Sequence, residues 1–345
     1  MLGRKKYIDI AKAFGICLVI FGHLICGNGY LSNIIFSFHM PLFFLLSGYT
    51  EKRREMFGGG WGEYIALQFK RLIFPYILFY AITVLFVGYF DLNGFVRDTY
   101  LAHAGAYNNF SGHLWFLVCL FFVKLLAFIF NQFYDSGYKY VALIFLIIIF
   151  SMTKVFPPEL FPYCRYPFKI DSAIIALPFY LLGQIVSKKD SDESFPFSCP
   201  HDKRLIFYIC VIFALVGLLF EPTLNGSVNI VFLQTNDIVL YYLFAIIGCF
   251  AVISISKLIE HKIKYFHLIG KYSLYFFMFH WLFILLWVKI VSFYRHQVIS
   301  AMGNMAYIDC ILGLIFVLIM TSFCTYIYLG IFKYIKHKIY GSSIT

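Results

Sequence analysis

Ten long apolar segments constrain the fold of this chain more than any other feature of its sequence. Each approaches the length that an α-helix needs to cross the hydrocarbon core of a bilayer, about 20 residues. The runs are continuous rather than alternating, as expected for spanning helices and not for barrel strands. They cover approximately Ile8–Ile25, Ser32–Tyr49, Leu72–Phe90, Leu114–Phe133, Tyr140–Phe156, Ser172–Ser187, Leu205–Phe220, Ile238–Leu258, Tyr272–Phe293 and Ile308–Phe332. The sequence therefore predicts an all-α, polytopic membrane helix bundle of about ten transmembrane helices.

The composition supports the same class of protein. Of the 345 residues, 61% are hydrophobic and only 13% are charged, and the 43 Phe and 27 Tyr exceed what one soluble core can bury. The two shortest segments are the fifth and the sixth, and Pro178 is expected to interrupt the sixth. Without internal repeats or a soluble appendage, residues 1–345 are expected to form one domain.

The basic residues indicate how the helices are oriented. Most of the 28 Lys and Arg lie at the N-terminus, in alternate loops and in the C-terminal tail. The opposite loops hold Arg97, Lys154, Arg165, Lys169 and Arg295. By the positive-inside rule, both termini are expected to be cytoplasmic. The formal charge of +11 then reflects topology and contact with anionic lipids, and nucleic acid is not an expected partner.

Two further patterns exclude other interpretations. The nine Cys are scattered, without the spacing of a metal site, so no metal is expected and the cysteines are read as small buried hydrophobes. The basic N-terminus resembles a signal peptide, but Asp9, Lys12 and His23 interrupt the apolar run and no cleavage site follows. The first segment is therefore expected to be retained as a helix.

Lys12 and His23 stand out within that first segment. Asp9, Lys12, Ile16, Val19 and His23 share one helix face, and Lys12 and His23 are separated by about 16 Å along the axis. Both residues are costly in lipid, and they can snorkel to opposite surfaces or line a polar cavity. In the functional interpretation, Lys12 holds an anionic group that enters from the cytoplasm. His23 then acts as a general base on a hydroxyl group.

Other polar residues in the apolar segments can likewise have either a structural or a functional role. His39 precedes Pro41 in the second segment and either accompanies a kink or lines a pocket. Lys70 and Arg71 are expected in the loop before the third helix, where they bind phosphate or anchor at lipid headgroups.

Residues of the fourth and later segments pose similar questions. His113 and Trp115 open the fourth segment at a depth similar to that of His23, so the two histidines can share a cavity. His280 is near mid-depth in the ninth segment and should face the bundle interior. Lys124 has no assigned role. Glu221, Asp171 and Asp237 are expected to be solvated at outer helix ends, where a sugar site can use one of them.

Taken together, these pieces resemble the acyltransferase-3 family of membrane O-acyltransferases, in the fucose-4-O-acetylase-like branch. The residues that carry the resemblance follow the family's order over four-fifths of the chain. They are "DIAK" with Asp9 and Lys12 followed by His23, "FHMPLFFLLSGY" from Phe38, "KRLIFPY" from Lys70, "HLWFL" from His113 and "SLYFFMFH" ending at His280. The Arg/Lys-x10-His element is rather specific, whereas each of the other pieces is weak alone.

The resemblance implies transfer of an acyl group, usually acetyl from acetyl-CoA, to a carbohydrate hydroxyl at or beyond the outer membrane face. His23, Lys12 and His113 are then candidate catalytic residues. Lys12, Lys70 and Arg71 are candidate residues for binding acyl-CoA, and His39, Trp115 and His280 for binding substrate. We expect direct attack by the sugar hydroxyl rather than an acyl-histidine intermediate.

The chain departs from the family at one motif. Many members have an Arg-x-x-Arg element before the third helix, but Gln68 and Arg71 occupy those positions here. A phosphate clamp would then rest on Arg71 with Lys70. Some relatives also carry a C-terminal extracytoplasmic hydrolase-like domain. This chain ends at Thr345, so its own bundle or a partner is expected to meet the acceptor.

The functional prediction is therefore an O-acyltransferase in the bacterial cytoplasmic membrane. Its expected partners are membrane lipids, a carbohydrate acceptor and a polysaccharide biosynthesis complex. One alternative is an exporter of polysaccharide or lipid-linked sugar, because a buried His/Lys set also suits a proton-coupled path. Another is a structural subunit of a synthase complex, which would tolerate loss of Lys12 and His23. The sugar, its hydroxyl and the acyl group are not determined by the sequence.

Overall fold

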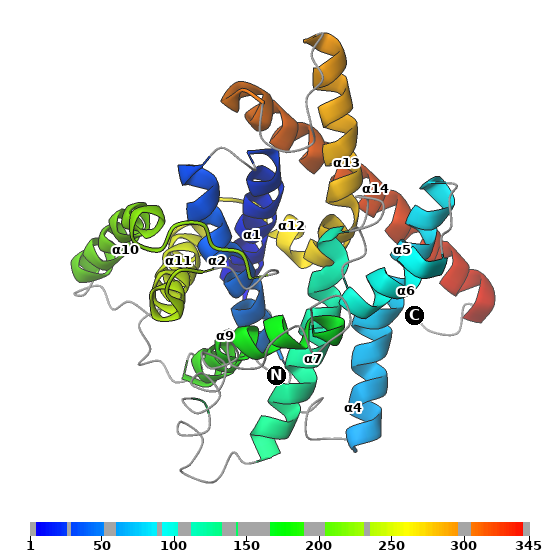
Figure 1. Cartoon of the computed structure of the whole chain (residues 1–345), viewed down its shortest axis with the longest axis horizontal. Helices are drawn as coiled ribbons and strands as arrows, with labels where there is room; N and C mark the ends of the chain where they lie inside the picture. The colour runs from blue at the N-terminus through cyan, green and yellow to red at the C-terminus, as the bar shows by residue number, and fades with distance from the viewer. Residues whose placement is uncertain are drawn as a thin grey trace. The chain divides into compact units, whose positions relative to one another are not determined.

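The protein is described from a computed structural model. The described residues are 5–25, 29–51, 60–87, 92–102, 112–132, 143, 166–189, 204–230, 235–295 and 305–340. Within these ranges the regular structure is helical and contains no β-strand. The predicted all-α fold is therefore confirmed (Figure 1).

Nine helical segments in the described ranges are long and apolar enough to cross a membrane. They agree with nine of the ten predicted segments, and the remaining one, Tyr140–Phe156, lies outside the described residues except for Leu143. The nine spans are Lys6–Leu24, Tyr30–Tyr49, Trp61–Ile82, Gly112–Asn131, Pro167–Lys188, Phe207–Asn225, Ile238–Ile259, Ser273–Tyr294 and Tyr307–Gly330. The chain is thus a multi-pass membrane protein, and the cytoplasmic location of its termini stays a prediction.

The third span differs from its predicted limits. Instead of starting at Leu72, it runs without interruption through α4 (Trp61–Gln68), a π-helical turn (Phe69–Ile73) and α5 (Phe74–Val87). The Phe74 N–H donates to the Phe69 carbonyl, five residues back. Pro75 has no N–H for the usual ladder, so a widened turn just before it is physically reasonable. The prediction that Lys70 and Arg71 precede the helix was wrong, because both lie inside it.

Pro178 also behaves differently from the expectation. Helix α9 spans Ile170–Lys189 with Pro178 inside it, so the proline does not end the sixth segment. A 3-10 turn, Pro167–Lys169, leads directly into α9.

The contacts divide the chain into two compact units. Unit 1 contains Phe36–Ser254, and unit 2 contains Gly3–Ile35 together with Ile255–Thr345. The boundary falls within α2 (Tyr30–Tyr49).

Unit 2 is built on α1 (Lys6–Leu24). Helix α1 packs against α12 (His267–Lys271), α13 (Ser273–Tyr294) and α14 (Tyr307–Tyr340), and α13 packs against α14. The approach of α12 to α1 is close, because a Cβ on Gly270 would lie 1.7 Å from the Asp9 carbonyl oxygen. The rings of Phe14 and Phe266 meet edge to face beside this contact, with centroids 5.0 Å apart. Glycine at position 270 therefore permits the packing that holds α12 on the first turns of α1.

Unit 1 contains α2 from Phe36 onward, α4, α5, α6 (Leu92–Leu101), α7 (Trp115–Gln132), α9, α10 (Arg204–Asn225) and α11 (Ile238–Ile259). Helices α2 and α9 touch backbone to backbone. A Cβ on Gly48 would lie 1.9 Å from the Tyr180 carbonyl oxygen, and one on Gly183 would lie 2.0 Å from the Leu45 carbonyl oxygen. Small residues at facing positions allow this approach, as is common between membrane helices.

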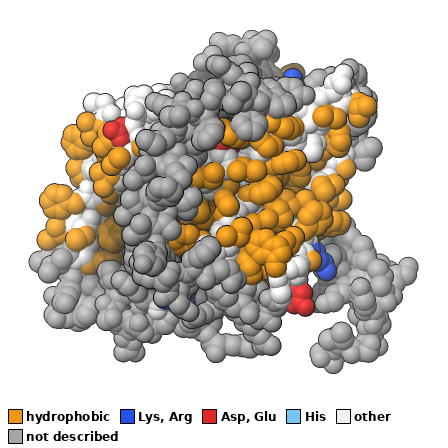
Figure 2. Space-filling view, turned by 60° about the horizontal axis from the view of Figure 1, so that its bottom comes forward, with side chains coloured by type: hydrophobic (Ala, Val, Ile, Leu, Met, Phe, Trp, Pro, Cys, Tyr) orange, Lys and Arg blue, Asp and Glu red, His pale blue; other side chains and the backbone are white. Residues whose placement is uncertain are grey.

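Large apolar side chains are exposed along several of these helices. Examples are Ile212 and Phe213 on α10, and Ile319 and Phe323 on α14. In the view of Figure 2, most of the described side chains in sight are hydrophobic and few are charged. Such patches would destabilise a water-soluble monomer but suit contact with lipid chains.

Candidate functional site

The stripe on α1 that carries Lys12 and His23 is buried for most of its length. Asp9, Ile16 and Val19 are buried, whereas Lys12 and His23 are partly buried. Neither end of the stripe is fully exposed to the surroundings, as simple snorkelling would require. The shared helix face predicted from the spacing is therefore compatible with an interior role for both side chains.

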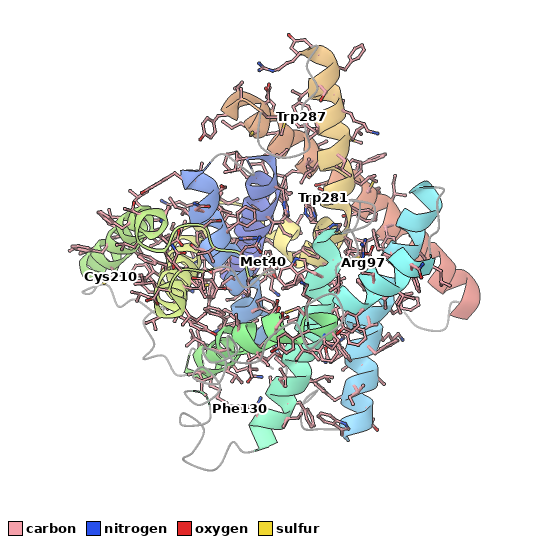
Figure 3. All side chains as sticks on the ribbon, in the orientation of Figure 1. Met40, Arg97, Phe130, Cys210, Trp281 and Trp287 are labelled. Carbon is pink, nitrogen blue, oxygen red and sulfur yellow. The ribbon has the colours of Figure 1, made fainter. Side chains whose placement is uncertain are left out.

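His23 meets two aromatic side chains of α13. Its ring is stacked with that of His280, with centroids 5.8 Å apart and planes inclined by 23°. Trp281 approaches the His23 ring edge to face, with centroids 4.9 Å apart. Figure 3 labels Trp281 on α13, with Trp287 further along the same helix. The structure thus brings the two predicted residues His23 and His280 together and adds Trp281, which the sequence did not single out.

The protonation of His280 follows from its surroundings. The ring is 1% exposed, and Nδ1 lies 2.7 Å from the carbonyl oxygen of Phe277. A carbonyl oxygen only accepts hydrogen bonds, so Nδ1 carries the hydrogen and donates it. When the ring is neutral, Nε2 is the nitrogen with a lone pair.

Basic and aromatic side chains gather near the first turns of α1. Lys257 Nζ lies 4.6 Å from the centroid of the Tyr7 ring and 2.9 Å from Glu260 Oε1. Lys271, which ends α12, follows the glycine that contacts Asp9. The end of unit 2 that holds Lys12 is therefore rich in cations. That is the expected surrounding for a negatively charged ligand or lipid headgroups.

The other predicted site residues belong to unit 1. His39 is buried on α2, with its ring edge to face against Phe36 at 5.1 Å. His113 is buried in the 3-10 turn Gly112–Leu114, and Trp115 is buried at the start of α7. Lys70 and Arg71 are exposed on the π-helical turn. The cavity predicted to join His113 with His23 stays a prediction.

Gln68 occupies the position where the sequence departs from the Arg-x-x-Arg element. Its side chain is buried, and within the described residues neither its amide nitrogen nor its amide oxygen has a hydrogen-bond partner. Because its amide group carries no charge, Gln68 cannot replace the missing cation. The positive charge of this turn comes from Lys70 and Arg71, which are exposed.

Lys124 acquires a partner that the sequence did not reveal. Its ammonium group forms an ion pair with the Glu51 carboxylate, just beyond the end of α2, and lies 5.7 Å from the centroid of the Tyr180 ring. Tyr64 of α4 donates a hydrogen bond of 3.2 Å to the other carboxylate oxygen of Glu51. The pair explains how a lysine midway along an apolar helix is accommodated.

Two of the three acidic residues expected to be solvated are not. Glu221 and Asp171 are buried, whereas Asp237 is exposed and accepts hydrogen bonds from the N–H groups of Val239 and Leu240 at the start of α11. The expectation failed for Glu221 because it continues the buried face of its helix, a property that hydrophobicity alone does not reveal.

Across the part of the chain that the structure describes, no three His, Cys, Asp or Glu side chains form a group that could hold a metal ion.

Comparison with known proteins agrees with this architecture. The family model described as the acyltransferase domain of acyltransferase-3 proteins matches residues 5–330. No curated protein and no solved structure matches the chain. The matched region covers most of both units and includes all of the predicted site residues. This multi-pass membrane protein therefore belongs to the acyltransferase-3 family.

Proposed function

We propose that this protein transfers an acetyl or other short acyl group from cytosolic acyl-CoA to a hydroxyl group of a cell-surface or lipid-linked carbohydrate. The bacterial cytoplasmic membrane is the compartment that suits this reaction, since the thioester is made in the cytosol whereas surface glycans are completed outside. The fucose-4-O-acetylase-like branch is the part of the family whose motifs the sequence resembles.

One observation carries the proposal: His23 is packed against His280 and Trp281 within a chain of the acyltransferase-3 family. A histidine has an ordinary pKa near neutrality and is the commonest general base. Packing between two rings restricts the orientations of His23, which favours a defined direction for proton transfer.

The remainder of α1 suits the donor. Lys12 is three helical turns from His23, and α12 with Lys271 is held against the same end of α1. Coenzyme A is an extended molecule with several phosphate groups, and cations recognise phosphate through charge-assisted hydrogen bonds. Lys12 would bind the anionic part of the donor while the thioester reaches toward His23. Lys70 and Arg71, exposed on the π-helical turn, are further candidate residues for binding acyl-CoA.

The reaction needs one base and one acceptor. His23 removes the proton of the sugar hydroxyl as its oxygen bonds to the thioester carbonyl carbon. The carbon–sulfur bond then breaks, and the sulfur of coenzyme A leaves as a thiolate. The protonated His23 returns its proton to that thiolate, so the products are the sugar ester and free coenzyme A.

The test is incorporation of label from acetyl-CoA by membranes of the source cells that contain the full chain. We expect labelled, base-labile acetyl groups in the envelope glycan fraction. His23→Ala should lower the rate by about 10²–10⁴-fold because the general base is lost. His261→Ala is the matched control, since the side chain of that histidine is 92% exposed. If the glycan gains no label while His23→Ala still blocks glycan export, the protein is an exporter and the proposal is wrong.

A further inference from the structure

The buried face of α10 ends in two polar residues. Side chains along this face recur at intervals of three and four residues, as expected for one side of a helix. They are Phe207, Val211, Ala214, Leu218, Glu221 and Asn225, all of which are buried. On the opposite side, Phe220 and Leu224 are exposed. Glu221 and Asn225 therefore occupy positions where the packing of the helix calls for apolar side chains.

Glu221 and Asn225 both have side-chain atoms without a hydrogen-bond partner among the described residues. Both are 0% exposed, and among the described residues both carboxylate oxygens of Glu221 and the amide nitrogen of Asn225 have no hydrogen-bond partner. Asn225 is nevertheless held in place by its other amide atom. Its Oδ1 accepts hydrogen bonds from Thr235 Oγ1 at 3.1 Å and from the Asp237 N–H at 2.8 Å. These contacts orient Asn225 and leave its two N–H hydrogens available.

Glu221 and Asn225 differ from the other polar residues at this end of unit 1. A buried polar group without a hydrogen bond destabilises a protein, and buried carboxylates are rare unless they are paired. Other polar residues at this end of unit 1 are used to complete local structure. Asp171 accepts a hydrogen bond from the Ser172 N–H at 2.7 Å, and the Ser172 hydroxyl donates to the Ile230 carbonyl oxygen at 3.0 Å. Glu221 and Asn225 thus keep hydrogen-bonding atoms that a ligand can pair with.

We propose that Glu221 and Asn225 form a subsite that binds hydroxyl groups of the carbohydrate acceptor. The carboxylate of Glu221 accepts a hydrogen bond from one hydroxyl, and Nδ2 of Asn225 donates to the oxygen of a neighbouring hydroxyl. Such pairs of donors and acceptors match the vicinal hydroxyls of a sugar ring. The predicted topology supports this assignment, because it is expected to place the end of α10 and the start of α11 on the outer side of the membrane. The inference rests on the proposed function.

The test uses the full chain in source membranes, with labelled acetyl-CoA and envelope glycan isolated from the same cells as the acceptor probe. Glu221→Gln keeps the shape of the side chain but replaces an accepting oxygen with a donating nitrogen. We expect the KM for the glycan to rise by tenfold or more, with kcat and the KM for acetyl-CoA within about twofold of the unmodified protein. Glu63→Gln is the matched control, since Glu63 is exposed on α4.

Thermal unfolding separates a binding role from a structural one. Since Glu221 has no described partner, Glu221→Gln and Glu221→Met should unfold at the same temperature as the unmodified protein or higher. An unchanged KM for the glycan in Glu221→Gln would overturn the assignment, and so would a lower unfolding temperature in both variants. Absence of transfer by the unmodified protein would instead contradict the proposed function itself, so the two failures are distinguishable.

Discussion

The ring of His280 lies against the ring of His23, with centroids 5.8 Å apart, although the two residues come from opposite ends of the chain. The hydrogen bond between His280 Nδ1 and the Phe277 carbonyl fixes which nitrogen of His280 carries hydrogen. This relationship joins a helix near the N-terminus to one near the C-terminus and gives His23 a defined neighbour.

His280→Phe should keep the ring packing but remove both nitrogen atoms. We expect acyl transfer to fall by about 10–100-fold while the unfolding temperature changes little, because the ring still fills the site. Initial rates and thermal unfolding of the same membranes provide the measurement. His261→Phe, which changes an exposed histidine, should leave both quantities unaltered. A rate equal to that of the unmodified protein would show that the His280 nitrogens have no part in the reaction.

Trp281 should act through its ring rather than through its indole nitrogen. Trp281→Phe preserves an aromatic edge beside His23, so activity should stay within about threefold. Trp281→Ala loses an aromatic pair worth about 0.5–1.5 kcal/mol, and kcat should fall by about 2–10-fold. The measurement is kcat for Trp281→Phe and Trp281→Ala. An equal fall in kcat for the two variants would contradict an orienting role for the ring.

Lys12→Ala should weaken binding of the donor more than it slows the chemical step. We expect the KM for acetyl-CoA to rise by about 10–100-fold, because a charge-assisted hydrogen bond contributes about 1.5–3 kcal/mol. Lys12→Arg should restore most of the affinity, and Lys262→Ala, at an exposed lysine, serves as the control. An unchanged KM in Lys12→Ala would exclude Lys12 from the donor site.

Gly270→Ala should disturb the packing of α12 on α1. The new Cβ would lie 1.7 Å from the Asp9 carbonyl oxygen and 3.0 Å from the Ala13 nitrogen, so the helices must separate. The expected result is a lower unfolding temperature and a higher KM for acetyl-CoA. Gly217→Ala is a stringent control, because no atom lies within 4 Å of its added Cβ and alanine favours the helix.

Lys124→Met should leave the buried Glu51 carboxylate without its cation. Breaking a buried ion pair on one side destabilises a protein by about 3–5 kcal/mol, whereas the double variant Lys124→Met with Glu51→Gln should regain most of that stability. Unfolding temperatures of the two single variants and the double variant test the coupling. Lys289→Met, in an exposed position of α13, should have little effect.

Much of the fold could be predicted because a bilayer imposes simple physical requirements on the sequence. Apolar stretches of spanning length must form helices that satisfy their own backbone, so nine of the ten segments could be located before any tertiary information. The limits of the third span were wrong because "QFKRLIFPY" contains charged residues that look like a loop. In the structure they are part of a continuous helix with a π-helical turn.

The candidate site was only partly predictable. Local spacing placed Lys12 and His23 on one face of α1, since helical periodicity depends only on neighbouring residues. Nothing in the sequence around Trp281 distinguishes it from a tryptophan that lies at the membrane interface. The pairing of Lys124 with Glu51 depends on contacts between helices distant in sequence, which periodicity does not encode.

The sequence by itself determined that this chain is a multi-pass helical membrane protein whose first helix carries a lysine and a histidine on one face. Hydrophobic length and helical periodicity are local properties, and they suffice for that conclusion. Only the tertiary structure decided that His23 is packed against His280, that Lys124 has a counter-charge and that Glu221 is buried rather than solvated. Those outcomes depend on which helices meet and at what height, and that is set by packing between segments far apart in the chain.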